Sequence, residues 1–200
     1  MTKPKVYLIG GSPRTGKSTL MHRFLEQQPI MAVSTDAIRY LLSNTEGVND
    51  QRLFQQGSAT DLNSTPQTTL ERQNSESFAV WEACEKLIES NQEDGLDILI
   101  EGVAVLPNLT AQLQVEHQAV FLGDQSDDLS SRIQKAAADN RYDWLRNNTN
   151  GPEDFDTYAD FFKHMSKWLE KECQTHNQSY FEMRDSHQTA MEAALTHLLS

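Results

Sequence analysis

The sequence lacks any apolar run long enough to span a membrane, and it is poor in basic residues. Lysine and arginine together number 17 against 29 aspartates and glutamates, so the net charge is −12. An acidic surface repels nucleic acid and anionic membranes. We therefore expect neither as a partner.

Cysteine is scarce as well. Cys84 and Cys173 are the two present, and both fall in apolar helical stripes, which predicts core thiols in a reducing compartment. The stretch Met1–Pro4 leads directly into an apolar segment and leaves no room for a secretory leader. These features predict a cytoplasmic protein, and 200 residues suffice for one domain with a well-buried core.

Five short apolar runs alternate with helical patterns along the chain. The runs cover residues 5–9, 30–33, 98–100, 119–122 and 180–183. Apolar residues recur at helical spacing from Phe78 to Ile88, with Gly95 as the helix stop, from Phe155 to Leu169, and from Met191 to Leu198. Strands that alternate with helices predict an α/β fold of three layers, in which helices cover both faces of a five-stranded parallel sheet.

Two polar stretches interrupt this alternation. Residues 43–76 are rich in Asn, Gln, Ser and Thr, with one weak helical patch at Leu53 and Phe54, and residues 126–152 combine a basic segment with a polar loop. Long polar connections in a compact domain are usually functional covers or disordered. Because each adjoins candidate binding residues, we predict a substrate cap at about 43–76 and a lid at about 126–152 on a single domain spanning 1–200. A surface insertion without a role is the alternative for each.

Residues 11–18 form a complete G-x-x-x-x-G-K-[ST] phosphate-binding loop between an apolar run and a helical pattern. Glycines let the backbone N–H groups point inward, and the helix that begins near Gly16 adds its positive dipole end. Lys17 is expected to reach the β- and γ-phosphates, and the Ser18 hydroxyl to ligate Mg²⁺. We predict that a nucleoside triphosphate is held by Gly11, Ser12, Pro13, Arg14, Thr15, Gly16, Lys17, Ser18 and Thr19.

Charged residues follow the second and third apolar runs. Asp36 and Arg39 come after the second, and Glu101 ends the third in a Walker B-like arrangement. Ligands bind at the carboxyl ends of parallel strands, so all three are expected beside the phosphate loop. Asp36 is a candidate general base or water-mediated Mg²⁺ ligand, Arg39 an anion grip, and Glu101 a metal or substrate contact. A helix N-cap is the alternative for Asp36, although Thr35 is another candidate for that cap.

Three arginines, Arg132, Arg141 and Arg146, follow the fourth apolar run. On one continuous helix Arg132 and Arg146 would share a face, and Arg141 would lie opposite. Helical kinases use arginines in this region to stabilise charge on the transferred phosphoryl group, so all three are candidate catalytic residues. The alternative is a solvated helix face.

Taken together, these motifs resemble P-loop kinases of the adenylate-kinase-like group, in particular 2-phosphoglycerate kinase and related small-molecule kinases. The resemblance rests on residues 11–18, 34–39, 100–103, 106–107 and 180–183, and on the late helix with Tyr158, Phe162 and Trp168. It implies ATP and Mg²⁺ as cofactors, an acceptor held near Asp36 and Arg39, and a lid that carries arginines.

The leading hypothesis is therefore a kinase that transfers the γ-phosphate of Mg-ATP to a small metabolite, with phosphorylated or acidic compounds among the candidates. A nucleoside monophosphate kinase, a toxin-like small-molecule kinase and an ATP-binding regulator without transfer activity are the alternatives. Phosphate release with ATP alone would favour the regulator, whereas acceleration by one class of acceptor would identify a kinase.

Overall fold

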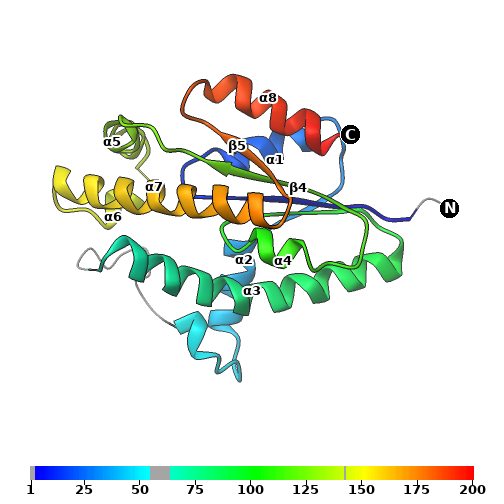
Figure 1. Ribbon diagram of the computed structural model, residues 1–200. Helices are drawn as coiled ribbons and strands as arrows, with labels where there is room; N and C mark the ends of the chain where they lie inside the picture. Colours follow the sequence, from blue (N-terminus) through cyan, green and yellow to red (C-terminus); the bar gives the residue numbers. More distant parts are fainter. Residues whose placement is uncertain (1–2, 55–63, 142) are drawn as a thin grey trace.

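The computed structural model describes residues 3–54, 64–141 and 143–200 (Figure 1). Five strands form one sheet in the order β2-β3-β1-β4-β5, and every neighbouring pair is parallel. The strands are β1 (Val6–Gly11), β2 (Met31–Ser34), β3 (Ile98–Glu101), β4 (His117–Gly123) and β5 (Ser179–Glu182). The predicted α/β fold with a five-stranded parallel sheet is confirmed.

Helices cover both faces of this sheet. In Figure 1, α1 (Lys17–Leu25) and α8 (His187–Leu198) lie above it, and α3 (Pro66–Asp94), α4 (Pro107–Thr110) and α7 (Pro152–Thr175) lie below it. The remaining helices are α2 (Thr35–Asn44), the 3₁₀ turn η1 (Gln51–Phe54), α5 (Leu129–Asp139) and α6 (Trp144–Asn147). Right-handed crossovers between parallel strands place helices on the two faces in this way.

Alternation along the strands divides the core into two layers. Val6 and Leu8 of β1 belong to the apolar cluster between the sheet and helices α3 and α7. Tyr7 and Ile9 belong to the cluster between the sheet and helices α1 and α8. Side chains of a strand point to opposite faces in turn, so a sheet covered on both sides needs a continuous apolar run. This explains why the strand positions could be predicted from short apolar runs.

Both cysteines lie within this core, as expected from the sequence. Cys84 on α3 and Cys173 on α7 are buried free thiols. Burial raises the pKa of each thiol to about 12, because the apolar surroundings disfavour the thiolate. Their contribution is packing.

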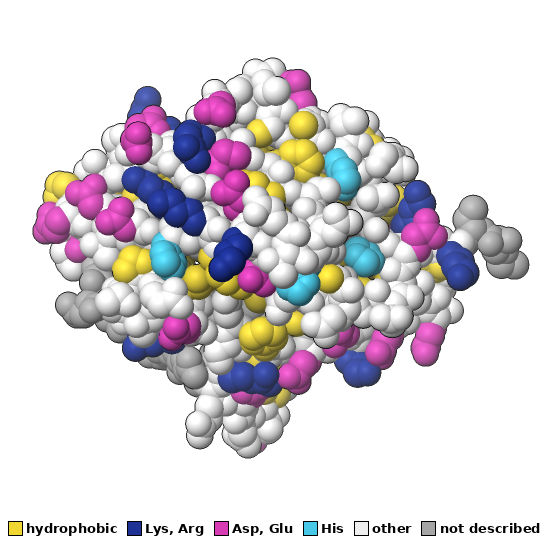
Figure 2. All heavy atoms as spheres, viewed as in Figure 1, with side chains coloured by type: hydrophobic (Ala, Val, Ile, Leu, Met, Phe, Trp, Pro, Cys, Tyr) yellow, Lys and Arg dark blue, Asp and Glu magenta, His cyan; other side chains and the backbone are white. Residues whose placement is uncertain are grey.

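The surface of the described residues is mixed in charge. In Figure 2, Lys and Arg side chains are interspersed with Asp and Glu side chains over the visible face. Within residues 3–54, 64–141 and 143–200, no helix combines the length and the apolar character needed to cross a membrane.

The polar stretch 43–76 contains more helix than its composition suggested. It includes the end of α2, the turn η1 and the first turns of α3, while residues 55–63 lie outside the described part of the chain. Helix α3 begins at Pro66 behind the N-cap Thr65, whose Oγ1 accepts a hydrogen bond from the Thr68 N–H at 3.2 Å. Its buried face there includes Thr69 and Gln73, so hydrophobic periodicity does not reveal the helix.

The turn after β3 depends on a glycine. Ser34 of β2 is paired with Glu101 of β3, so the chain segments that follow these two strands lie against each other. Gly102 has a φ of 142°, and a Cβ added to it would lie 1.9 Å from Thr35 Oγ1. Only glycine allows the approach that holds Glu101 and the start of α2 together.

We expect Gly102→Ala to lower the free energy of unfolding by about 3 kcal/mol or more, because the new Cβ overlaps Thr35 and the backbone is strained. Gly95→Ala is the matched control. Gly95 also has a positive φ, 72°, but nothing lies within 4 Å of its added Cβ, so a loss of about 1 kcal/mol is expected. Equal losses in chemical denaturation would show that the contact with Thr35 does not constrain the turn.

Candidate active site

The phosphate loop joins β1 to α1 and is stabilised by hydrogen bonds to its own backbone and to β4. The carbonyl oxygen of Ser12 accepts hydrogen bonds from Thr15 Oγ1 at 2.9 Å and from Lys17 Nζ at 2.8 Å, and the Ser12 N–H donates to the Leu122 carbonyl. Helix α1 begins after Gly16, which has a φ of 91°, without any side-chain cap. The N–H groups of its first turn are therefore available to an anion.

Lys17 is buried at the centre of the site, with 9% of its surface exposed. Burial lowers the pKa of its ammonium group, while the nearby carboxylates Glu101 and Asp36 act in the opposite direction. A cation held in a poorly solvated place interacts strongly with any phosphate that enters. This arrangement suits a group that stabilises developing phosphate charge.

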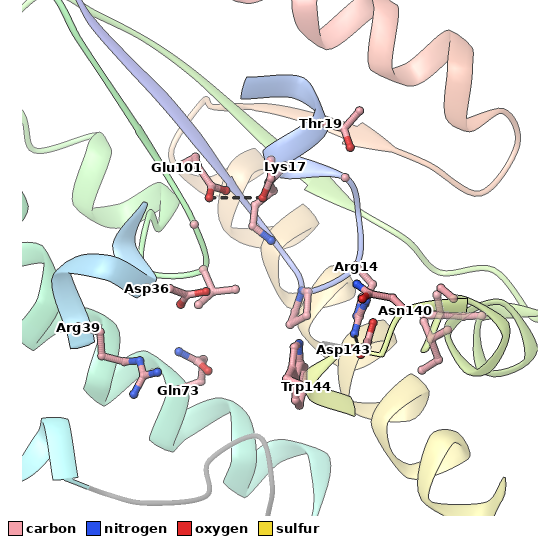
Figure 3. A pocket seen from close by; sticks show the side chains of 18 of the residues that line it. Arg14, Lys17, Thr19, Asp36, Arg39, Gln73, Glu101, Asn140, Asp143 and Trp144 are labelled. Carbon is pink, nitrogen blue, oxygen red and sulfur yellow. Dashed lines mark hydrogen bonds and ion pairs between the residues drawn. The ribbon is translucent and has the colours of Figure 1, made fainter. Parts of the chain in front are cut away.

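Glu101 lies at the carboxyl end of β3, on the same side of the cavity as Lys17 (Figure 3). The Ser18 hydroxyl donates to Glu101 Oε1 at 3.5 Å, and the carboxylate is 6% exposed. Burial raises the pKa of Glu101, and the charge of Lys17 partly offsets that effect. The structure thus brings together two of the three side chains predicted to bind metal, Ser18 and Glu101.

Asp36 extends into the same cavity from the first turn of α2. The N-cap of α2 is Ser34, whose Oγ accepts a hydrogen bond from the Asp36 backbone N–H at 3.2 Å. Both sequence-based alternatives for the cap, Asp36 and Thr35, are therefore wrong. Because Ser34 supplies the cap, the Asp36 carboxylate is left to act in the cavity.

One cavity of about 1040 Å³ joins the phosphate loop to a second wall. The predicted residues that line it are Pro13, Arg14, Gly16, Lys17, Ser18, Thr19, Asp36, Arg39, Glu101 and Arg132, whereas Gly11, Ser12 and Thr15 are not among its lining residues. Six further lining residues carry polar groups or an aromatic ring and were not predicted as site residues: Gln73, Glu76, Asn140, Asp143, Trp144 and His187. Figure 3 shows Arg39 and Gln73 on the side of Asp36, with Trp144 facing them.

Arg14 connects the phosphate loop to α6. Its guanidinium forms an ion pair with Asp143 and lies 5.8 Å from the ring centroid of Trp144. Trp144 is supported by Tyr158, with ring centroids 5.5 Å apart and planes at 88°. Asp143 also caps α6 by accepting from the Leu145 N–H. An aromatic residue within a polar segment is the one sequence signal that could have indicated this contact.

Arg132 is the lid arginine that reaches the cavity. Its guanidinium donates to Asp124 Oδ2 at 2.7 Å and to Asp128 Oδ1 at 3.0 Å. Burial raises the pKa of the Asp124 carboxyl, but hydrogen bonds from Ser126 and Arg132 outweigh this effect and hold that pKa below its usual range. Arg132 is therefore oriented by two carboxylates, and the charged form of one of them, Asp124, is favoured by these hydrogen bonds.

The continuous helix assumed for the three lid arginines is wrong. Helix α5 ends at Asp139, and Asn140 takes an extended conformation with φ −123° and ψ 110°. Arg141 therefore lies between α5 and α6, and Arg146 lies on α6. Both side chains are exposed, and neither lines the cavity. Their catalytic roles stay predictions.

A buried serine on α7 links the phosphate loop to the end of β4. Ser166 Oγ lies 2.8 Å from Ser12 Oγ and accepts a hydrogen bond from the Asp124 N–H at 3.0 Å. Since Asp124 in turn holds Arg132, the loop and the lid arginine share one support. No sequence pattern indicated this serine.

No protein-family model matches the sequence, and a comparison with curated proteins finds no significant match. Solved structures are similar in fold. A gluconokinase from Sinorhizobium meliloti 1021 has a TM-score of 0.50 at 13% identity, over 100% of this chain and 94% of that chain. A shikimate kinase from Bacteroides thetaiotaomicron has a TM-score of 0.50 at 17% identity, over 98% and 96%. The chain therefore has the fold of P-loop kinases, while the narrower resemblance to 2-phosphoglycerate kinases stays a prediction.

Proposed function

We propose that this protein is a kinase that transfers the γ-phosphate of Mg-ATP to a hydroxyl group of a small metabolite. One observation carries the proposal. The phosphate loop, Lys17, Asp36, Glu101 and Arg132 converge on one cavity that has a separate wall formed by α2 and α3. A site that only retained nucleotide would not need this second wall.

The residues present fit Mg²⁺ and a nucleotide. The Ser18 hydroxyl and the Glu101 carboxylate lie 3.5 Å apart, and the Asp36 carboxylate lines the same cavity. Among the described residues no group of three or more His, Cys, Asp or Glu is arranged to hold a metal. Mg²⁺ commonly takes one or two protein ligands and completes its shell with phosphates and water. When bound, it would neutralise charge on the phosphates.

The side chains of the site would then perform two tasks, stabilising the phosphoryl group and handling the acceptor. Lys17 and Arg132 stabilise the charge on the phosphoryl group in transit, because both are held by hydrogen bonds beside the loop. Asp36 takes up the proton of the acceptor hydroxyl, and Arg39 holds the acceptor. Arg141 and Arg146 remain candidates for contacts made when the lid closes.

The proposal is tested by measuring Mg-ATP binding by calorimetry and ADP formation with and without acceptors. We expect binding that requires Mg²⁺ and ADP formation that an acceptor accelerates. Phosphate release at the same rate without any acceptor would favour an ATP-binding regulator instead.

Amide hydrogen exchange in α5 and α6 is expected to be faster than in β1 and β4 without ligand and to slow when Mg-ATP and acceptor bind. The reason is that the Arg14–Asp143 pair connects α6 to the phosphate loop and that Arg132 of α5 lines the cavity beside it. The same measurement on Lys17→Ala is the control, since impaired nucleotide binding should leave exchange unchanged. Equal exchange with and without ligand in the wild type would make the segment an ordinary part of the scaffold.

A further inference from the structure

The wall of the cavity opposite the phosphate loop has a defined chemical character. It is formed by Asp36 and Arg39 of α2 and by Gln73 and Glu76 of α3, and Trp144 of α6 lies across the cavity from it. Figure 3 shows Asp36, Arg39 and Gln73 on one side and Trp144 on the other, with open space between them. An acceptor next to Asp36 must contact these side chains.

Each arginine that lines the cavity already has a carboxylate partner. Arg39 Nε lies 3.7 Å from Glu76 Oε1, Arg14 pairs with Asp143, and Arg132 pairs with Asp124. Lys17 is turned to the phosphate loop and donates to the Ser12 carbonyl. Residues 55–63, which lie outside the described part of the chain, contain no lysine or arginine in the sequence.

The carboxylates on this wall disfavour an anionic acceptor. The side chain of Glu76 is 12% exposed, burial raises its pKa, and the negative charge of Asp36 acts in the same direction. An anionic acceptor that formed an ion pair with Arg39 would leave the Glu76 carboxylate buried, without its arginine partner and close to Asp36. Like charges brought together in this way oppose binding.

Hydroxyl groups suit the same side chains without that cost. The carboxylates of Asp36 and Glu76 accept from O–H groups, the Arg39 guanidinium donates to hydroxyl oxygens, and the Gln73 amide does both. The ring of Trp144 offers a flat apolar face for the C–H side of a small ring. A polar, uncharged ring compound has the hydroxyl groups and the apolar C–H face that match these side chains.

We propose that the acceptor is an uncharged polyhydroxylated compound of about the size of a monosaccharide, rather than a carboxylic acid or a phosphate ester. This rests on the proposed kinase function. One hydroxyl oxygen of the acceptor bonds to the γ-phosphorus, and the bond from that phosphorus to the β,γ-bridging oxygen breaks. ADP leaves with that electron pair, and Asp36 takes the hydroxyl proton.

The test is a panel of matched acceptors, each assayed by ADP formation with wild-type protein and Mg-ATP. The pairs are D-glucose with D-glucuronate, myo-inositol with myo-inositol 1-phosphate, and glycerol with glycerol 3-phosphate. We expect kcat/KM for an accepted neutral compound to exceed that of its charged counterpart by about tenfold or more. A charged compound that is preferred to its neutral counterpart overturns the inference, as does transfer to no neutral member.

Glu76→Gln tests the cause of this preference. The substitution frees Arg39 and removes a negative charge, so the ratio of kcat/KM for the charged member over the neutral member should rise about tenfold. Glu82→Gln is the matched control on the same helix. Glu82 is 67% exposed, pairs with Arg52 and does not line the cavity, so its loss should leave the ratio unchanged. An unchanged ratio in Glu76→Gln would contradict the charge argument.

The two proposals fail in different ways. Wild-type protein that does not bind Mg-ATP overturns the kinase function itself. Protein that binds Mg-ATP but transfers phosphate only to acids or phosphate esters overturns the acceptor class and leaves the kinase function standing. The wild-type panel decides this even if Glu76→Gln does not fold.

Discussion

Lys17→Ala is expected to lower kcat for phosphoryl transfer by about 100-fold or more while the protein stays folded. Lys17 is the buried cation of the phosphate loop, where charge develops on the β- and γ-phosphates. Its burial lowers its pKa, which means that the folded protein holds the ammonium at a cost. Because Lys17 belongs to neither apolar core cluster, the fold should survive its removal, and steady-state ADP formation together with thermal unfolding measures both effects.

Lys135→Ala is the matched control for this experiment. Lys135 lies on α5, is exposed and does not line the cavity, so the same loss of positive charge should leave kcat unchanged. If Lys17→Ala folds and transfers phosphate at the wild-type rate, Lys17 does not stabilise the transferred phosphate and the role assigned to it is wrong.

Asp36→Asn is expected to lower kcat by about 10²–10⁴-fold, with a much smaller effect on ATP binding. An amide of nearly the same size cannot take up the acceptor's proton, and it is a poorer partner for Mg²⁺. The fold should survive because Ser34 caps α2 through the Asp36 backbone N–H, which the substitution keeps. Rates under saturating ATP and a separate titration of nucleotide binding distinguish the two effects.

Raising the Mg²⁺ concentration separates the two roles considered for Asp36. If the carboxylate acts through the metal, excess Mg²⁺ should recover much of the lost rate, since phosphoryl transfer often needs little help from a base. If it acts as the base, the rate should stay low. Wild-type turnover by Asp36→Asn at ordinary Mg²⁺ would show that the acceptor does not bind at this aspartate.

Arg39→Ala provides the contrast at the same wall. Arg39 is expected to hold the acceptor equally in the ground state and the transition state, so its loss should raise KM for the acceptor more than it lowers kcat. Ser34→Ala tests the cap of α2. It removes that cap and a side-chain hydrogen bond to Glu101, and it should cost about 1 kcal/mol of stability.

Strand positions and the phosphate loop could be predicted because their signals are local. An apolar run such as 98–100 specifies a strand buried on both faces, and the spacing of Gly11, Gly16, Lys17 and Ser18 specifies the turn before α1. The start of α3 was missed for a local reason as well. Thr69, Gln73 and Ser77 are buried there, so the buried stripe is not an apolar one.

The partners within the site were decided by tertiary structure alone. Arg14 and Asp143 are 129 residues apart in the chain, and Ser12 and Ser166 are 154 apart. Nothing in the neighbourhood of either member specifies such a pair, because it forms only when β1, β4 and α7 have packed together. The same holds for Glu76, whose pairing with Arg39 decides the charge that an acceptor meets. The sequence by itself determined the turn of the phosphate loop at the carboxyl edge of the sheet, since that turn is encoded by adjacent residues. The packing of α2, α3 and α6 around that edge decided what surrounds it.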